Sequence, residues 1–328
     1  MNEPKQQPFL LDAHEDIAHH IIKHKRDFVN PRVDAMITLP ELKRGGVSMA
    51  LATLFNANIE KEPPPREMAR RQLGVYRRLF AEHADGIVQV SSKRDVAALA
   101  SEHAEKGASA RIGIMLAMEG ADAIAGERDL ERYYAAGVRA ILPTWGDNRY
   151  GFGRTNMKDP ITDAGKWLIR RMDKMGVLLD VSHFGVASFM SALEAANGPV
   201  IASHSNCYAV CKHPRNLNDK QIKALAEKGG VMGVCLYNHF IKDGSQMATL
   251  DDVWAHVSHV LDLVGDDHLG IGTDFDGGVT KEYTPIGLDS IGDLPIFLDF
   301  LREKGLSSEA VAKIAGGNVL RVLKSVIA

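Results

Sequence analysis

The chain has few cysteines and no long apolar segment. Its 328 residues include only three cysteines, Cys207, Cys211 and Cys235, which cannot all pair with one another and which form no CxxC motif. A disulfide framework is therefore disfavoured, and a reducing compartment is expected. No window approaches the roughly 18 apolar residues that a membrane-spanning helix needs.

The N-terminal segment also lacks the features of a secretion signal. MNEPKQQPFLLDAHED contains only the short apolar run FLL before Asp12, whereas the apolar region of a signal peptide has about 7–15 residues. We therefore expect a cytoplasmic protein without a membrane segment. The alternative that this chain is the processed form of a longer precursor stays open.

Two classes of partner are disfavoured by what is missing. The net charge is -3 and no stripe of Lys and Arg is present, so nucleic acid is not an expected partner. No GxGxxG motif follows the first predicted strand, so a dinucleotide-binding Rossmann fold has little support. With 45% hydrophobic and 25% charged residues, the composition is that of a globular protein with a substantial core.

Eight short apolar segments recur along the chain and are predicted to be strands. They span residues 9–14, 47–55, 112–118, 138–145, 177–183, 199–204, 230–237 and 268–274. Helical periodicity occupies the intervals, as in 94–107, 162–176 and 219–230, and residues 293–328 predict two closing helices. Apolar strands that alternate with helices indicate a parallel sheet, and eight of them predict an α/β fold of the (β/α)8 TIM-barrel type. We expect residues 1–328 to form a single catalytic barrel domain.

Most of these strands end in side chains that can bind a metal. They are His14, Asp16, Glu119, His183, His204 and Asp274. In a barrel of this type the C-terminal ends of the strands meet at one rim, which carries the active site. Side chains two apart on a strand share a face, so His14 and Asp16 are predicted to converge, whereas Glu15 points to the other face and takes no part in the chemistry.

A divalent cation would account for so many ionisable groups in one space. Neighbouring carboxylates raise one another's pKa, and burying them without a counter-charge is costly. Three imidazoles and two carboxylates suit Zn²⁺, with Mn²⁺, Co²⁺ or Fe²⁺ as substitutes. Five ligands exceed the needs of one tetrahedral zinc. The set therefore predicts two metals about 3.5–4 Å apart, bridged by a carboxylate and a hydroxide, and hence metal-assisted hydrolysis. A structural role for each residue is the alternative, since a lone HxD motif occurs by chance in many proteins.

The order of these motifs resembles the membrane (renal) dipeptidases and their bacterial relatives, within the metal-dependent amidohydrolase superfamily. The block from SHSN to HPRNLND, followed by TDFDG, is the most specific part of the match. The matching segments follow one another along most of the chain: DAHEDI (12–17), AMEGADAI (117–124), GVRAILPTW (137–145), LLDVSHFG (178–185), PVIASHSNCYAVCKHPRNLND (199–219), GGVMGVCLYNHFI (229–241) and GIGTDFDGG (270–278).

The resemblance implies a set of metal ligands. His14, Asp16 and Glu119 would bind one zinc, and Glu119, His183 and His204 would bind the other, so that two Zn²⁺ ions per chain share Glu119 as a bridge. This glutamate stands where many members of the superfamily use a carbamylated lysine, so no lysine modification is expected.

The resemblance also implies catalytic and substrate-binding residues. Asp274 would act as general acid and base, taking a proton as the metal-bridging hydroxide attacks and giving it to the leaving amine. Arg215 would pair with a substrate carboxylate through its planar guanidinium, and the backbone around Tyr237 would help to hold the substrate. Asp276 and Gly277 would shape the last loop, and a purely structural role for Asp276 is the alternative.

One position departs from the resemblance. Members of the family with dipeptidase activity carry a His after the fourth strand, in a Leu-Thr-His sequence, and this His helps to hold the scissile carbonyl or its oxyanion. Here the segment 142–145 reads Leu-Pro-Thr-Trp, so Trp145 occupies this substrate-binding position. An indole donates one N–H but cannot be cationic, and losing one oxyanion donor commonly costs about 10²–10³ in rate. Trp145 is expected either to weaken oxyanion support or to wall a pocket for an apolar group.

Two further polar segments are interpreted without a role in the chemistry. His19, His20 and His24 invite a metal-binding interpretation, but a solvated segment after Asp16 is favoured. The glycine-rich segment 146–156 predicts either a mobile lid or a long turn, and both alternatives stay open.

We therefore expect a binuclear zinc dipeptidase that hydrolyses the amide bond of small dipeptides, L-Xaa-D-Xaa dipeptides among them. One alternative is a related amidohydrolase that acts on another small amide or on a lactone, with Trp145 marking the changed substrate. The other is a metal-binding relative without turnover. The expected partner is the dipeptide substrate. The resemblance also allows a second copy of the chain as a partner, because members of the family often form homodimers.

Overall fold

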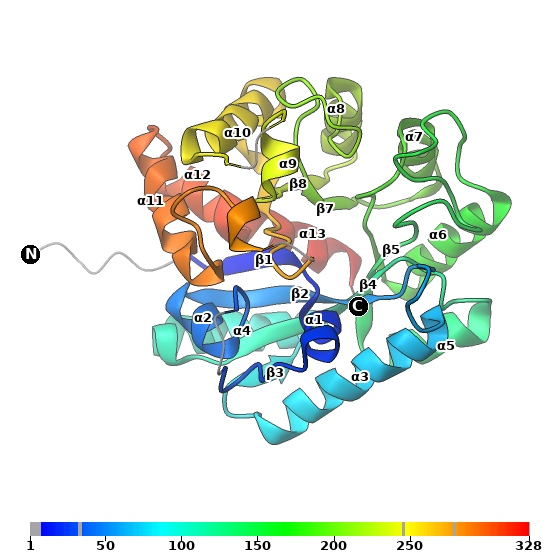
Figure 1. Cartoon of the computed structure of the whole chain (residues 1–328), viewed down its shortest axis with the longest axis horizontal. Coiled ribbons are helices and arrows are strands. Elements are labelled where there is room, and N and C mark those ends of the chain that lie inside the picture. The colour runs from blue at the N-terminus through cyan, green and yellow to red at the C-terminus, as the bar shows by residue number, and fades with distance from the viewer. Residues whose placement is uncertain (1–7, 32–34, 245–246, 278–279, 328) are drawn as a thin grey trace, which may run out of the picture.

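The computed structural model describes residues 8–31, 35–244, 247–277 and 280–327 of the chain. Within these residues nine parallel strands form one sheet, which curls into a barrel with helices around the outside (Figure 1). The strands are β1 (Leu10–Glu15), β2 (Val47–Phe55), β3 (Ile87–Gln89), β4 (Ile112–Glu119), β5 (Val138–Leu142), β6 (Leu178–Leu179), β7 (Ile201–Ser205), β8 (Val231–Val234) and β9 (Leu269–Ile271). Hydrogen-bonded neighbours follow the order β6-β5-β4-β2-β1-β9-β8-β7, and β3 lies off this path, paired with β4.

The two ends of this strand order meet between β6 and β7. Asp180, just after β6, forms a parallel bridge with Ile201 of β7. The N–H of Val181 donates to the carbonyl of Ile201 at 2.7 Å. These contacts close the barrel, so the predicted α/β fold of TIM-barrel type is confirmed.

Helices connect successive strands and cover the barrel. They are α1 (Ile17–His24), α2 (Leu39–Arg44), α3 (Pro65–Glu82), α4 (Lys93–Lys106), α5 (Glu127–Ala135), α6 (Asp163–Met175), α7 (Val186–Ala195), α8 (Asp219–Glu227), α9 (Asn238–Ile241), α10 (Leu250–Val264), α11 (Leu294–Glu303), α12 (Ser308–Ala312) and α13 (Asn318–Val326). Local sequence sets several of their ends. The Thr162 hydroxyl accepts from the N–H of Gly165 at the start of α6, and Gly176 ends this helix in the left-handed conformation (φ 67°). Among the described residues no helix is both long and apolar enough to cross a bilayer.

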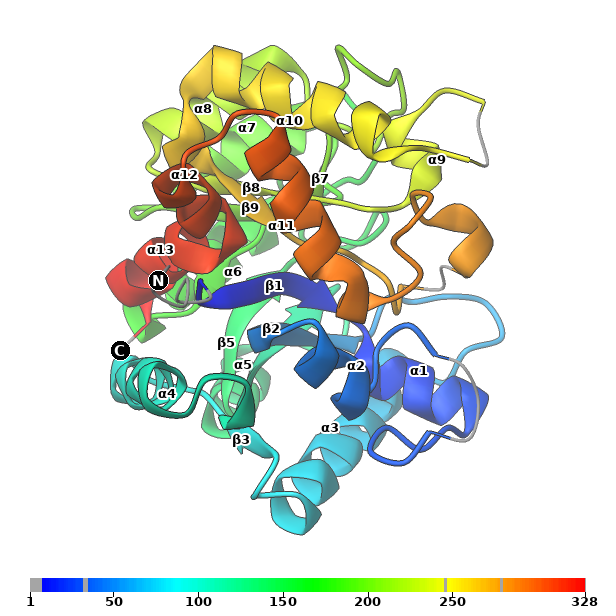
Figure 2. The ribbon, with the colours of Figure 1, turned by 90° about the vertical axis from the view of Figure 1, so that its left-hand side faces the viewer.

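Apolar side chains from most of the strands fill the interior of the barrel. Leu11, Met49, Met115 and Ile201 belong to this cluster, together with side chains of α13 such as Leu323. The helix α13 packs against β1, β8 and β9, and the turned view shows it beside the start of β1 (Figure 2). The N-terminal end of the barrel is therefore packed with apolar side chains, and the opposite rim is left for polar groups.

The structure corrects the sequence predictions at three places. The strand β3 was not predicted, because it has three residues and two of them, Val88 and Gln89, are only half-buried. Several predicted strands are shorter than expected, most clearly 177–183, in which only two residues form β6. The second closing helix is split into α12 and α13 by a π-helical turn, in which Gly316 has non-helical backbone angles.

Candidate metal centre and substrate cavity

A register shift in β1 aims the first two predicted ligands into the barrel. Between Asp12 and Glu15 this strand advances by three residues while its neighbour β2 advances by two. One extra residue reverses the face on which the following side chains lie. His14 and Asp16 therefore point to the interior, where they meet Glu119 at the end of β4.

The six predicted site residues at the strand ends form one cluster. Three groups each bring their ligand atoms within 4.8 Å of one another: His14, Asp16 and Glu119; Glu119, His183 and His204; and His14, His204 and Asp274. Neighbouring groups share residues, so the cluster is continuous. The structure thus brings together every residue that the sequence placed in the metal centre.

The Glu119 carboxylate lies between the imidazoles. Its Oε1 is 3.1 Å from the Nε2 of His183 and 3.7 Å from the Nε2 of His204, and its Oε2 is 3.6 Å from the Nε2 of His14. The Nε2 atoms of His183 and His204 face each other at 2.9 Å. One carboxylate oriented toward three imidazole nitrogens is the arrangement expected of a bridging ligand.

Burial gives this cluster a strong preference for a cation. It raises the pKa of Glu119 to about 8, and burial together with the charge of Glu119 raises the pKa of Asp16 to about 8. Burial lowers the pKa of His183 and His204 well below their usual value. By themselves the carboxylates hold protons near neutral pH and the imidazoles do not. A divalent cation supplies the counter-charge that allows the carboxylates to ionise.

The hydrogen bonds around the imidazoles also fit a metal. The Oγ of Ser203 lies 2.8 Å from the Nδ1 of His204 and 3.3 Å from the Nδ1 of His14. Within the described part of the chain, the buried Nε2 of His14 has no hydrogen-bond partner. The hydroxyl of Thr53 donates to Asp16. Metal-binding His and Asp side chains are commonly oriented in this way by outer contacts. The donor set therefore fits the predicted metal centre.

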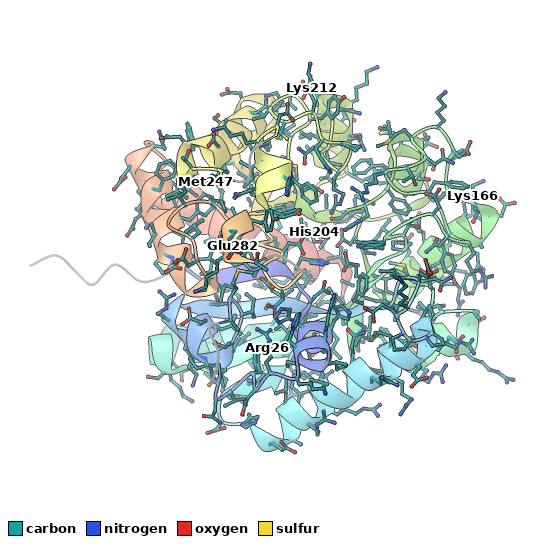
Figure 3. The ribbon with its side chains drawn as sticks, viewed as in Figure 1. Arg26, Lys166, His204, Lys212, Met247 and Glu282 are labelled. Atoms are coloured by element: carbon teal, nitrogen blue, oxygen red, sulfur yellow. The ribbon has the colours of Figure 1, made fainter. Side chains whose placement is uncertain are left out.

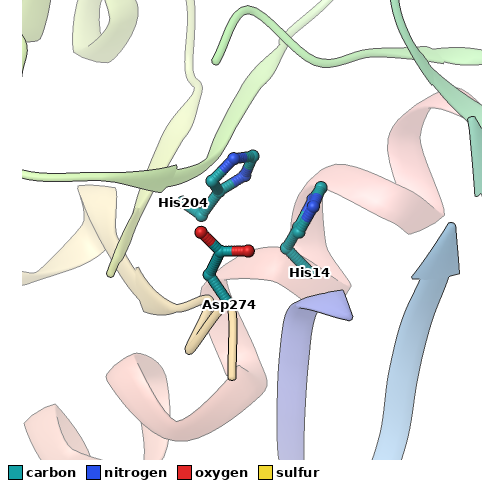
Figure 4. A group of neighbouring side chains, drawn as sticks. All are labelled: His14, His204 and Asp274. Atoms are coloured by element: carbon teal, nitrogen blue, oxygen red, sulfur yellow. The ribbon is translucent and has the colours of Figure 1, made fainter. Parts of the chain in front are cut away.

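Asp274 lies at the edge of the same cluster. Its carboxylate lies beside the side chains of His14 and His204 (Figure 4), and each of the three offers a ligand atom within 4.8 Å of the others. Burial raises the pKa of Asp274 to about 7, which is suited to taking up and releasing a proton near neutral pH. Asp274 (φ 61°) and His183 (φ 67°) both have left-handed backbone conformations, which non-glycine residues adopt at a cost of order 1–3 kcal/mol and mainly at functional sites.

A cavity of about 650 Å³ opens onto the cluster, and the three predicted substrate-binding residues line it. Arg215 is buried. Its Nη2 donates to the carbonyl of His204 at 2.9 Å, and its Nε has no hydrogen-bond partner among the residues that the structure describes. Tyr237 and Trp145 are half-buried. The Trp145 ring lies edge-on to Phe55 with centroids 5.7 Å apart, so the two rings form an apolar wall beside the centre.

The structure can be compared with the sequence interpretation at two further segments. His19 and His20 lie on α1, are half-buried and line the cavity, so the interpretation of a solvated segment is wrong for them. The segment 146–156 is hydrogen-bonded within itself and to Gly185, which fits the long turn and does not test the mobile lid. The Gly153 N–H donates to Asp147 at 2.8 Å, and the Gly185 N–H donates to the carbonyl of Phe152 at 2.8 Å.

Sequence reasoning missed the residues that orient the ligands. Ser203 and Thr53 lie within strands β7 and β2 and carry no motif of their own. The only available signal was that Ser203 precedes His204 in the SHS sequence.

A parallel barrel with imidazoles and carboxylates gathered at the C-terminal rim defines the class of metal-dependent hydrolases. Residues 4–328 match the model of one family, membrane dipeptidase (peptidase family M19). The chain belongs to this family and is a metal-dependent dipeptidase.

Three individual proteins are similar to this chain over most of its length. An uncharacterized protein in the pqqA 5′ region of Klebsiella pneumoniae is 34% identical over 276 residues, which cover 80% of this chain and 97% of that protein. The dipeptidase aclJ of Aspergillus oryzae is 29% identical over 97% of this chain and 78% of its own length. A metallo peptidase from Rhodobacter sphaeroides, solved with a phosphinate mimic of the dipeptide L-Ala-D-Ala, superimposes with a TM-score of 0.88 at 22% identity. It covers 98% of this chain and 100% of that chain, and at this identity it shows the fold.

Proposed function

We propose that this dipeptidase uses two Zn²⁺ ions and hydrolyses small dipeptides, including L-Xaa-D-Xaa dipeptides. The observation that carries the proposal is the pair of donor groups that share Glu119: His14 and Asp16 on one side, and His183 and His204 on the other. The dipeptide mimic bound to the Rhodobacter sphaeroides relative supports the substrate class. When bound, the two cations supply Lewis acidity, which polarises the scissile carbonyl and activates water.

The other residues of the site handle the proton and the substrate. Asp274 accepts a proton as water attacks the carbonyl carbon and donates it to the nitrogen of the leaving amine as the C–N bond breaks. Arg215 binds the carboxylate of the dipeptide, and its buried Nε, which no other described residue contacts through a hydrogen bond, supports this role. Tyr237 holds the substrate on the same side, and Trp145 with Phe55 contacts an apolar substrate group.

One observation favours a second candidate function, the hydrolysis of another small amide or of a lactone. Trp145 occupies the position at which dipeptidases of the family carry a histidine, and an indole beside the centre favours an apolar substrate group over support of an oxyanion. A dipeptide and a small lactone would use the same metal centre and the same acid, so only the substrate distinguishes them.

Three measurements test the proposed function. Metal analysis of protein purified without added metal should give about two divalent ions per chain, and fewer than one would refute the binuclear centre. A screen of L-L dipeptides, L-D dipeptides and lactones, with and without chelator, identifies the substrate class. If lactones turn over and dipeptides do not, the second candidate replaces the first. Asp274→Asn should abolish turnover and keep the metal, whereas an unchanged rate would remove Asp274 from its role.

A further inference from the structure

Buried polar side chains that lie outside the metal cluster contact the turn that carries Asp274. It begins three residues after the end of β9, and the N–H of Gly277 donates to the carbonyl of Asp274 at 3.1 Å. A Cβ atom at position 277 would overlap the Oδ1 of Asp274, so the turn is closely packed against that carboxylate. The backbone of Asp274 is in the left-handed conformation, which the surrounding contacts must maintain.

Glu15 supplies one of these contacts. It is fully buried, its Oε1 accepts from the hydroxyl of Thr273, and its Oε2 accepts from the N–H of Asp276 at 3.2 Å. One side chain of β1 thus binds the residue before Asp274 and the residue two positions after it. This position agrees with the prediction that Glu15 points away from His14 and Asp16. The side chain nevertheless forms hydrogen bonds with the segment that carries Asp274.

Arg26 supplies the second contact. It lies beyond the end of α1 (Figure 3), and its Nη2 forms an ion pair with the Oδ2 of Asp276. The side chains of Arg26 and Asp276 are 2% and 1% exposed, so water does not screen the pair. Asp276 also faces His20, with its Oδ1 3.8 Å from the Nδ1 of that ring. An ion pair buried to this extent restricts the position of both partners.

We propose that Arg26, Asp276 and Glu15 are positioning residues that hold the turn 274–277 and thereby place the Asp274 carboxylate at the metal centre. None of the three needs to touch the substrate for this role. The proposal rests on the proposed function of Asp274 as general acid and base. It follows that loosening the turn lowers the rate of proton transfer and leaves the metal ligands and the carboxylate-binding Arg215 in place, since misplacement by about 1 Å can cost about 10²-fold in rate.

The test compares two arginines that join the same regions of the chain. Arg26→Met removes the buried ion pair with Asp276. Arg44→Met is the control for loss of an exposed ion pair, because the Arg44 side chain is 51% exposed and pairs with Asp293 at 2.7 Å. With L-Ala-D-Ala as substrate, Arg26→Met should lower kcat by about 10- to 100-fold, with KM, metal content and a folded state retained. Arg26→Lys, which keeps one cation within reach of Asp276, should recover part of the loss. Arg44→Met should behave as the wild type.

A structural measurement makes the test independent of turnover. A crystal structure of the zinc-loaded Arg26→Met protein should show the Asp274 carboxylate displaced by about 1 Å. If Arg26→Met does not fold, Asp276→Asn, which keeps the shape of the side chain, should show the same loss of kcat and the same displacement.

The outcomes separate this proposal from the proposed function. An unchanged kcat and an unmoved Asp274 in folded Arg26 or Asp276 variants would overturn the proposal. A loss of kcat that the loss of bound metal accounts for, or that is no larger than the loss in Arg44→Met, would also overturn it. A wild-type protein that hydrolyses no dipeptide would instead refute the proposed function, and the displacement of Asp274 would then decide the positioning role alone.

Discussion

Ser203→Ala should weaken metal binding, because Ser203 contacts two predicted ligands. Its Oγ lies near the Nδ1 atoms of His204 and His14, and 3.3 Å from the Oγ of Ser182. If both rings present Nε2 to the metal, both Nδ1–H groups donate to Ser203, whose own hydroxyl donates to Ser182. Removing one oxygen therefore frees two imidazoles at once.

The magnitude follows from these two hydrogen bonds. Each contributes about 0.5–1.5 kcal/mol, so their joint loss amounts to about 1–3 kcal/mol. This corresponds to the 10- to 100-fold loss of metal affinity typical of outer contacts. Ser203 is 1% exposed, so water does not replace the hydroxyl.

The assay is a titration of metal-free protein with Zn²⁺ in competition with a chromogenic chelator. Ser188→Ala is the matched control. Ser188 is fully buried, and its Oγ accepts from the N–H of Phe152 at 3.1 Å and donates to the carbonyl of Asp159 at 2.8 Å, outside the metal cluster. This variant should lose stability but no metal affinity. Equal zinc affinities for Ser203→Ala, Ser188→Ala and the wild type would refute the role of Ser203.

Three further predictions concern stability, metal and substrate. His256 is buried, its Nδ1 accepts from the N–H of Cys207 at 3.0 Å, and burial lowers its pKa to about 4. Between pH of about 6.5 and about 4, His256 therefore binds a proton in the unfolded chain but not in the folded protein. The free energy of unfolding should fall by about 3 kcal/mol from pH 7 to pH 4 through this group, and urea unfolding should show a smaller fall in His256→Asn. Dialysis against a chelator should abolish turnover and lower the unfolding temperature, because Glu119 and its neighbours lose their counter-charge, and Zn²⁺ should restore both; a chelated protein of full activity would contradict a metal mechanism. Trp145→Ala should raise KM about 10-fold for dipeptides with aromatic side chains and less for L-Ala-D-Ala, with kcat little changed; an equal effect on both would exclude an apolar subsite at Trp145.

Much of the architecture could be predicted from sequence because its signals are local. The run Val47–Phe55 is apolar apart from Ser48 and Thr53, and in the structure it is a strand that is buried along its whole length. The cap residues Thr162 and Gly176 mark the ends of α6 by their own chemistry. Where the local signal is weak the prediction was wrong, as for β3, whose three residues form a strand only because β4 lies beside them.

The site was predicted less completely, because its outer contacts join distant parts of the chain. Ser203 and His14 are 189 residues apart, and Arg26 and Asp276 are 250 residues apart. Glu15 was excluded from the chemistry by its face alone. Its contact with the turn that carries Asp274 depends on how β1 and β9 pair.

By itself the sequence determined the order of the strands, the barrel and the chemical type of each donor, since these depend on side-chain polarity and on periodicity along the chain. Only the tertiary structure decided which way the donors point. Leu11 and His14 are three residues apart and would lie on opposite faces of a regular strand, yet both face the interior. The reason is the extra residue between Asp12 and Glu15 in the pairing of β1 with β2, which no local pattern indicates.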